Sequence, residues 1–204
     1  MIEFIYFDLG KVILNFDHSI GCQQVSNLTG ISPESVSDLI FQSGEQVKYE
    51  TGLISSAEFH RSFCEKTKTE PELDSFLNAV SDIFTANRPI FSLIGQLNRT
   101  GVPIGILSNT CEAHWDFVSK QYPILVELFG PKVLSFESKS MKPDAKIYVD
   151  AVSMADVAPE NCFFVDDRQE NVDGAVNCGI DAVLYRGVAD LISQLAERGF
   201  QVNL

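Results

Sequence analysis

The chain has 204 residues, of which 45% are hydrophobic and 21% charged, a balance typical of a globular protein and not of a disordered one. Asp and Glu total 28 against 15 Lys and Arg, which gives a formal net charge of -13 at pH 7. Nucleic-acid-binding proteins carry basic surfaces, so this charge argues against a nucleic-acid-binding function. An anionic substrate would need a cation or a local basic group to offset the repulsion.

The five cysteines are odd in number, scattered, and form no C-x-x-C pair, so we expect free thiols and neither a disulfide framework nor a zinc site. The N-terminus carries an early acid and no basic segment, unlike a signal peptide. No apolar run approaches the roughly 20 residues that span a bilayer. We therefore expect a cytoplasmic protein, monomeric or homodimeric, with no membrane or nucleic-acid partner.

Short runs of β-branched and aromatic residues alternate with helix-like stretches along much of the chain. The predicted strands are residues 3–7, 102–108, 132–136, 162–166 and 181–185. The predicted helices are residues 89–101, 143–155, 169–179 and 188–199. Nearly continuous apolar strands alternating with amphipathic helices predict an α/β fold, a Rossmann-like parallel sheet flanked by helices on both faces.

Residues 16–87 break this alternation, because they hold no convincing strand and several helical segments. Ser32 and Ser55 are expected to cap two of these helices, the second in a capping box with Glu58. The segment is therefore predicted to be a small helical insert after the first strand. We expect an α/β core domain of residues 1–15 and 88–204, and a helical domain of residues 16–87.

Polar side chains follow three predicted strands at their C-terminal ends, where parallel sheets bind ligands. The residues expected to meet there are Asp8, Ser108, Asn109, Asp166, Asp167 and, from the loop before a predicted helix, Lys142. Together they supply a carboxylate nucleophile, a cation, hydrogen-bond donors for phosphate oxygens, and carboxylates for Mg²⁺. Phosphoryl transfer needs this combination.

Four motifs in order, "FDLGKVI", "ILSNT", "KPDAKIY" and "FFVDDRQENVDGA", resemble the haloacid dehalogenase superfamily. The resemblance spans the chain, since the helical insert is similar to that superfamily's type 1 cap domain. Within the superfamily, the motifs look most like the sugar-phosphatase branch similar to α-D-glucose-1-phosphate phosphatase.

The resemblance implies a role for each residue that would touch the phosphoryl group. Asp8 would be the nucleophile and would form an aspartyl phosphate. Ser108 would donate to the phosphoryl oxygens, with Asn109 beside it. Lys142 would neutralise charge on the nucleophile and on the transferring group.

The same resemblance implies a Mg²⁺ site. Its ligands would be the carboxylates of Asp8 and Asp167 and the backbone carbonyl of Gly10, as suits a hard cation. Asp166, and with it Asn171, would be an auxiliary ligand of the metal or would support the other ligands. The metal would also offset the repulsion between the carboxylates and a phosphate.

Two residues depart from the superfamily pattern. Most phosphatases of the superfamily have a second aspartate, acting as general acid and base, where this chain has Gly10, and such a group typically contributes roughly 10²–10⁴-fold in rate. Its loss predicts a preference for acidic leaving groups such as the anomeric oxygen of a sugar 1-phosphate. Lys11 replaces an asparagine common in the sugar-phosphatase branch, and its side chain is expected either to reach solvent or to lie near the metal.

The helical insert should select the substrate by closing over the phosphate site. Candidate substrate-binding residues are Asp17, His18, Glu45, Tyr49 and Glu50, because carboxylates and a tyrosine can bind sugar hydroxyls and a ring face. Each also has a structural alternative, as a helix-start residue, a solvated helix face or part of the insert's core.

The leading prediction is a Mg²⁺-dependent phosphatase that hydrolyses a small phosphorylated metabolite, a sugar phosphate for preference, through an aspartyl phosphate. One alternative is a 2-haloacid dehalogenase, although two carboxylates without a cation would repel its substrate. Another is a catalytically impaired binding protein, suggested by Gly10 and Lys11.

Overall fold

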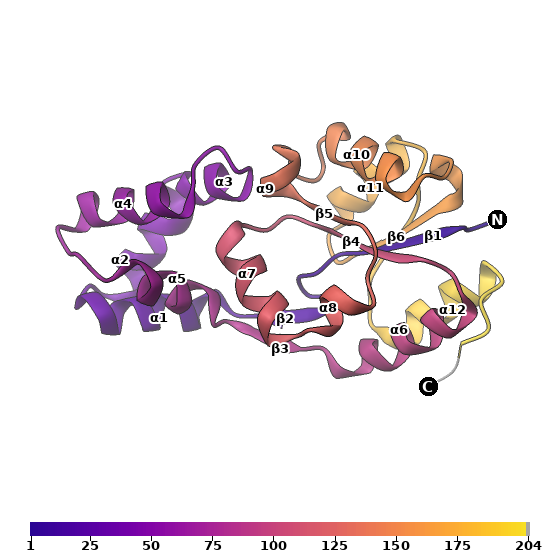
Figure 1. Ribbon diagram of the computed structural model, residues 1–204, viewed down its shortest axis with the longest axis horizontal. Helices are drawn as coiled ribbons and strands as arrows, with labels where there is room; N and C mark the ends of the chain where they lie inside the picture. The colour runs from indigo at the N-terminus through magenta and orange to yellow at the C-terminus, as the bar shows by residue number, and fades with distance from the viewer. Residues whose placement is uncertain (203–204) are drawn as a thin grey trace.

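The computed structural model describes residues 1–202, and its centre is a five-stranded sheet (Figure 1). The strands are β1 (Phe4–Phe7), β4 (Ile104–Ser108), β5 (Lys132–Leu134), β6 (Cys162–Asp166) and β7 (Asp181–Leu184). Their spatial order is β5-β4-β1-β6-β7, and each neighbouring pair is parallel. The predicted α/β fold is therefore confirmed, with β1 at the centre of the sheet.

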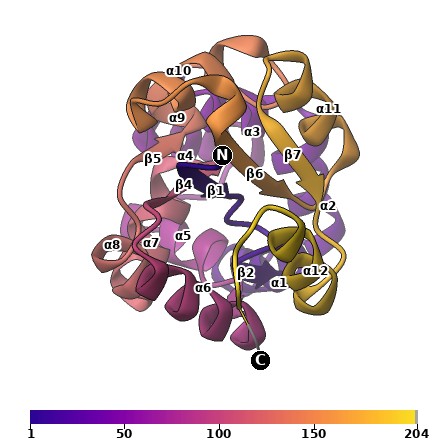
Figure 2. The same ribbon diagram turned by 90° about the vertical axis from the view of Figure 1, so that its right-hand side faces the viewer.

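Helices cover both faces of this sheet, as Figure 2 shows. The helices are α6 (Arg88–Thr100), α10 (Ala145–Ala155), α11 (Gln169–Asn177) and α12 (Val188–Glu197). Alternate residues of β1 point to opposite faces, with Ile5 and Phe7 in the apolar cluster under α6 and α12 and Tyr6 in the cluster under α10 and α11. All four β1 residues are buried, which explains why this strand reads as a continuous apolar run.

The region from β4 to β5 differs from the predictions in one strand boundary and in two additional helices. The strand expected at residues 132–136 ends at Leu134, and a short helix α9 (Ser135–Ser138) follows. Two helices that the sequence pattern did not single out, α7 (Glu112–Gln121) and α8 (Ile124–Glu127), lie between β4 and β5. Two further crossover helices therefore accompany the sheet.

The helices of residues 18–81 lie at one end of the molecule (Figure 1). They are α1 (His18–Thr29), α2 (Pro33–Ser37), a π-helical turn η1 (Asp38–Gln42), α3 (Glu45–Glu50), α4 (Ser56–Thr67) and α5 (Leu73–Ser81). These helices share an apolar cluster of their own, to which Cys111 and Ala113 at the start of α7 also belong. Both predicted caps are present: Ser32 accepts from the Ser35 amide, and Ser55 forms a capping box with Glu58.

The prediction that residues 16–87 hold no strand is wrong. Strands β2 (Leu14–Phe16) and β3 (Phe84–Ala86) form an antiparallel pair where the chain leaves the sheet and returns to it. Each has only three residues and one fully buried position, so neither shows the alternation that identifies a strand in sequence. No helix within residues 1–202 is both long and apolar enough to cross a bilayer.

Candidate active site

Three strand ends meet at one edge of the sheet. Asp8 follows β1, and its amide donates to the Val165 carbonyl of β6 over 2.9 Å. Ser108 ends β4 on one side of β1, and Asp166 ends β6 on the other. Because the three strands are parallel and in register, these side chains share one end of the sheet, as predicted.

Lys142 links these strand ends through its ammonium group. Its Nζ lies 2.9 Å from Asp8 Oδ1 and 2.6 Å from Asp166 Oδ2, and it donates to the Leu107 carbonyl over 2.9 Å. The Lys142 side chain is 1% exposed, and its three donors have three acceptors. A buried ammonium so paired is fixed in position.

Asp166 serves to hold Lys142 and the following turn in place. Besides Lys142, its two carboxylate oxygens accept from Asn171 Nδ2 over 3.0 and 3.1 Å, and Oδ1 accepts from the Arg168 amide over 2.8 Å. The residue is completely buried. Both oxygens of Asp166 are therefore committed to protein donors, so we interpret it as an organising residue.

Carboxylate oxygens of Asp8, Asp166 and Asp167 lie within 4.8 Å of one another, a grouping that could hold a metal ion. Asp8 Oδ1 is engaged by the Leu9 amide and Lys142, whereas Oδ2 accepts no hydrogen bond from residues 1–202. Oxygen donors at this spacing suit a hard divalent cation. Since Asp166 is saturated, Asp8 and Asp167 are the better ligands.

Burial dominates the ionisation of this cluster. It raises the pKa of Asp8 to about 7, with Asp166 and Asp167 adding to the rise and Lys142 opposing it. Burial alone would lower the pKa of Lys142, but Asp8 and Asp166 outweigh it and raise that pKa. Burial and the Asp166 charge also raise the pKa of Asp167. A bound cation would favour the charged carboxylates.

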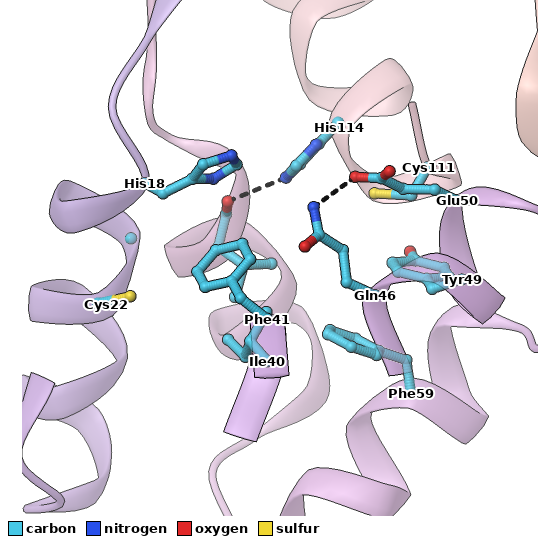
Figure 3. A pocket seen from close by; sticks show the side chains of 12 residues that line it. His18, Cys22, Ile40, Phe41, Gln46, Tyr49, Glu50, Phe59, Cys111 and His114 are labelled. Atoms are coloured by element: carbon cyan, nitrogen blue, oxygen red, sulfur yellow. Dashed lines mark hydrogen bonds between the residues drawn. The ribbon is translucent and has the colours of Figure 1, made fainter. Parts of the chain in front are cut away.

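A cavity of about 60 Å³ lies over these strand ends. Gly10, Ser108 and Asn109 line it from the sheet side, and His18 and Glu50 line it from the helical segment. A second, mainly apolar cavity of about 30 Å³ continues among the helices and shares His18, Glu50 and His114 with the first (Figure 3). His114 is a lining residue that the sequence analysis missed; its place three residues into the helix after β4 was the available signal.

Asn109, predicted to contact substrate, lines the cavity and also holds the backbone of Lys142. Its amide oxygen accepts from the Lys142 backbone amide over 2.8 Å, and its Nδ2 donates to the Lys142 carbonyl over 2.9 Å. The side chain thus fixes the backbone of Lys142 across 33 residues of sequence. These two hydrogen bonds position Lys142, and each polar atom of the Asn109 amide keeps the capacity for a second partner.

Three of the five residues of the helical segment that were predicted to bind substrate have structural partners. Asp17 caps α1 and accepts from the Ser19 amide and hydroxyl. Glu45 pairs with Lys48 at 3.0 Å and Lys66 at 3.8 Å, and it does not line either cavity.

Tyr49 lies in the core of the helical segment. Its ring stacks on Phe59 at 4.7 Å, and its hydroxyl accepts from the Ala113 amide. It lines the second cavity but not the one beside Ser108. The carboxylate that faces both cavities is that of its neighbour Glu50, one of the candidates from the sequence.

Lys11 is exposed, as expected for a side chain that reaches solvent, and it is not part of the carboxylate cluster. Its backbone adopts the left-handed conformation with φ of 59°. The ammonium lies 4.3 Å from the centre of the Phe16 ring and donates to the Phe16 carbonyl. Lys11 therefore holds Phe16 in place by a cation-π contact and a hydrogen bond.

Burial of His114, on α7, predicts that the protein loses stability in acid. Its ring contacts the Phe84 ring edge-on, and Nε2 lies 3.2 Å from the Val80 carbonyl. Burial, assisted by His18, lowers its pKa to about 4. Between pH 6.5 and 4 the unfolded chain therefore binds more protons here than the folded one. The folded state loses up to about 3 kcal/mol as the pH falls through this window.

We expect His114→Gln to remove this part of the pH dependence, because glutamine can donate to the same carbonyl and does not titrate. Urea denaturation of both proteins at pH 7 and pH 4.5 measures it. The free energy of unfolding of the wild type should fall more between the two pH values than that of the variant. Equal falls would contradict the assignment of a neutral buried His114.

Comparison with known families supports the motifs. A family profile described as haloacid dehalogenase-like hydrolase matches residues 21–179, which include Ser108, Lys142, Asp166 and Asp167 but begin after Asp8. The chloroplast flavin mononucleotide hydrolase 1 of Arabidopsis thaliana is 32% identical over 63 residues, 31% of this chain. That match spans 26% of the length of the Arabidopsis protein.

Several solved structures share the fold. A HAD family enzyme from Bacteroides thetaiotaomicron superposes with a TM-score of 0.82 and 23% identity, covering 95% of this chain and 98% of that one. A predicted HAD-like family hydrolase from Porphyromonas gingivalis gives 0.83 and 20%, covering 99% and 100%. L-2-haloacid dehalogenase from Xanthobacter autotrophicus gives 0.66 and 16%, covering 98% and 84%.

Proposed function

This chain belongs to the haloacid dehalogenase-like hydrolases, and we propose that it is a Mg²⁺-dependent phosphatase acting through an aspartyl phosphate on Asp8. The observation that carries the proposal is the placement of the buried Lys142 ammonium between Asp8 and Asp166, with Asp167 beside them. A carboxylate with one free oxygen, a fixed cation and a candidate metal site form a complete set for phosphoryl transfer. The Bacteroides enzyme that shares the fold was crystallised with magnesium and inorganic phosphate.

The residues present fit a Mg²⁺ ion. Asp8 and Asp167 would hold it, with the backbone carbonyl of Gly10, and Asp166 would remain bound to Lys142 and Asn171. Bound there, Mg²⁺ would offset the charge of the carboxylates and of the phosphate oxygens. The bound cation would also reduce the repulsion between an anionic substrate and a protein with a net charge of -13.

The side chains of the site carry out the steps of phosphoryl transfer. An oxygen of Asp8 attacks phosphorus, and Lys142 beside Oδ1 offsets the negative charge of the nucleophile and of the transferring group. The Ser108 hydroxyl, at the strand end and in the cavity wall, donates to a phosphoryl oxygen. Asn109 keeps Lys142 in register with Asp8 by its two hydrogen bonds. Water then hydrolyses the aspartyl phosphate and regenerates Asp8.

The proposed substrate is a small sugar phosphate, in line with the motifs similar to the glucose-1-phosphate phosphatase branch and with a type 1 cap formed by residues 16–87. His18, Glu50 and His114 line both cavities, and Gln46 lines the second; such polar groups can bind sugar hydroxyls. The small cavity volumes, about 60 and 30 Å³, favour a compact leaving group in this conformation.

Phosphate release from hexose 1-phosphates, hexose 6-phosphates and flavin mononucleotide, with and without Mg²⁺, tests the proposal. We expect metal-dependent release from at least one sugar phosphate. Halide release from L-2-chloropropionate without metal would favour the dehalogenase alternative. If folded protein in Mg²⁺ releases no phosphate from any of these esters, the result would favour the non-catalytic alternative.

Restoring the superfamily's aspartate by Gly10→Asp should not raise the phosphatase rate. A Cβ at position 10 would lie 2.8 Å from Cε1 of Phe16, whose ring is held by Lys11. Such overpacking costs about 1–3 kcal/mol. Urea denaturation should show this loss, and Phe16→Ala in the same chain should relieve it. A stable, faster Gly10→Asp single variant would contradict the account.

A further inference from the structure

Among the described residues that line the cavity over Ser108, the helical segment contributes one carboxylate, that of Glu50. It is the last residue of α3 and lines both joined cavities (Figure 3). Gly10, which takes the place of the superfamily's usual acid and base, lines the same cavity. A carboxyl group therefore faces the space that the missing aspartate would serve.

The backbone of Glu50 is fixed against the phosphate-binding strand end. The Ser135 hydroxyl lies 2.6 Å from the Glu50 carbonyl oxygen and accepts from the Thr110 amide over 2.9 Å. Thr110 follows Ser108 by two residues. Two residues after Glu50, the Gly52 carbonyl accepts from Lys139 Nζ over 2.6 Å. These contacts tie the end of α3 to the sheet domain beside Ser108.

The side chain of Glu50 is also fixed, and one of its oxygens is left available. Gln46, one helical turn earlier, donates from Nε2 to Glu50 Oε1 over 2.6 Å (Figure 3). Oε2 accepts no hydrogen bond from residues 1–202, so it can carry a proton. Burial raises the pKa of Glu50, and Gln46 and Arg168 oppose the rise. The environment therefore favours the protonated carboxyl more than a surface position would.

The two histidines of the same wall are poorer proton donors. His114 Nε2 is engaged with the Val80 carbonyl, and burial lowers its pKa to about 4. The His18 ring lies between those of Phe16, at 4.9 Å, and Phe41, at 4.6 Å, and burial lowers its pKa as well. Both imidazoles are neutral at pH 7 and hold no readily released proton.

We propose that Glu50 is the general acid and base of this site, in place of an aspartate at position 10; this rests on the proposed phosphatase function. As an Asp8 oxygen bonds to phosphorus, the bond from phosphorus to the leaving oxygen breaks. That oxygen takes the bonding electron pair and receives the proton of Glu50 Oε2. The Glu50 carboxylate then takes a proton from the water that attacks the aspartyl phosphate, which restores both carboxyl groups and releases phosphate.

This assignment changes the expected substrate range. Without any acid, the site should hydrolyse only esters with acidic leaving groups, as Gly10 alone predicts. With Glu50 protonating the leaving oxygen, esters of ordinary alcohols are substrates too, and their rates depend weakly on the acidity of the alcohol. The leaving-group dependence of the rate is therefore the diagnostic quantity.

The test compares Glu50→Gln with Glu65→Gln, an exposed glutamate on α4, on p-nitrophenyl phosphate and glycerol 2-phosphate in Mg²⁺. For Glu50→Gln we expect kcat/KM to fall roughly 10²–10⁴-fold on the glycerol ester, the usual contribution of a general acid. It should change little on the nitrophenyl ester, whose leaving group needs no proton. Glu65→Gln should match the wild type on both.

Equal losses of Glu50→Gln on both esters, or no loss on either, would overturn the acid role. If the melting curve shows that Glu50→Gln does not fold, kcat/KM of the wild type is measured on a series of alkyl and aryl phosphates. A weak dependence of kcat/KM on leaving-group acidity supports the proposal, and a steep dependence overturns it. Wild-type protein silent toward both of these esters and toward every hexose phosphate in Mg²⁺ would overturn the phosphatase function and, with it, this proposal.

Discussion

Asp8→Asn is expected to lower turnover of any phosphate ester by at least about 10⁴-fold, as removal of a catalytic nucleophile does. The amide is nearly isosteric but cannot form the aspartyl phosphate. The fold should survive, because Lys142 keeps its 2.6 Å contact with Asp166 and its bond to the Leu107 carbonyl. Phosphate release and circular dichroism of the same preparation measure the two effects.

Asp173→Asn is the matched control, since Asp173 is exposed on α11 at the surface of the same domain. It should leave turnover unchanged. Asp8→Asn protein that is folded and retains a substantial part of the wild-type rate would show that another group attacks phosphorus, or that water attacks directly.

Lys142→Met is expected to destabilise the metal-free protein by about 3–5 kcal/mol at pH 7, because two buried carboxylates lose their common cation. The pH dependence follows from linkage. Without Lys142 the folded-state pKa of Asp8, already raised by burial, lies further above its unfolded value, so the folded variant binds more protons than the unfolded chain. Its deficit relative to the wild type should therefore shrink as the pH falls from 7 to 5.

Urea denaturation at both pH values measures this deficit. Lys146→Met serves as the control, because Lys146 pairs with Asp150 at the surface and its side chain is 57% exposed. Exposed pairs contribute about 0–1 kcal/mol, so the control should change little at either pH. A Lys142→Met deficit no larger than that of Lys146→Met would contradict the view that Lys142 compensates the buried carboxylates.

The sheet and the strand-end residues were predictable because their signals are local. Each central strand is an unbroken apolar run, and in a parallel sheet the residue after each run lies at the same edge. Asp8, Ser108 and Asp166 follow from these rules alone. The short strands β2 and β3 carry no such signal. Their antiparallel pairing, with Leu14 opposite Ala86, is visible only in three dimensions.

The roles within the site depend on contacts between distant parts of the chain. Sequence placed Asn109 at the strand end, but not its two bonds to the Lys142 backbone. It suggested several acids of the helical segment without ranking them. Glu50 faces the site because Ser135, 85 residues away, holds its carbonyl, whereas Glu45 is turned toward Lys48 and Lys66.

The two departures from the superfamily pattern are related in the structure. Lys11 contacts Phe16, and Phe16 fills the space in front of Gly10. A side chain at position 10 and the ring of Phe16 would compete for one place. With the motif "DLGK", the ring of Phe16 takes the space that a side chain at position 10 would need. A proton donor therefore has to come from another residue of the cavity wall.

The central claim is that Asp8 carries the phosphoryl group during turnover. The most direct measurement is acid quenching of the Mg²⁺-loaded enzyme during turnover of its best ester, followed by mass spectrometry of the peptide that contains residues 3–13. The account predicts a peptide heavier by one phosphoryl group, with the modification on Asp8 and absent from Asp8→Asn. An enzyme that releases phosphate while this peptide stays unmodified, or carries the group on another residue, would contradict it.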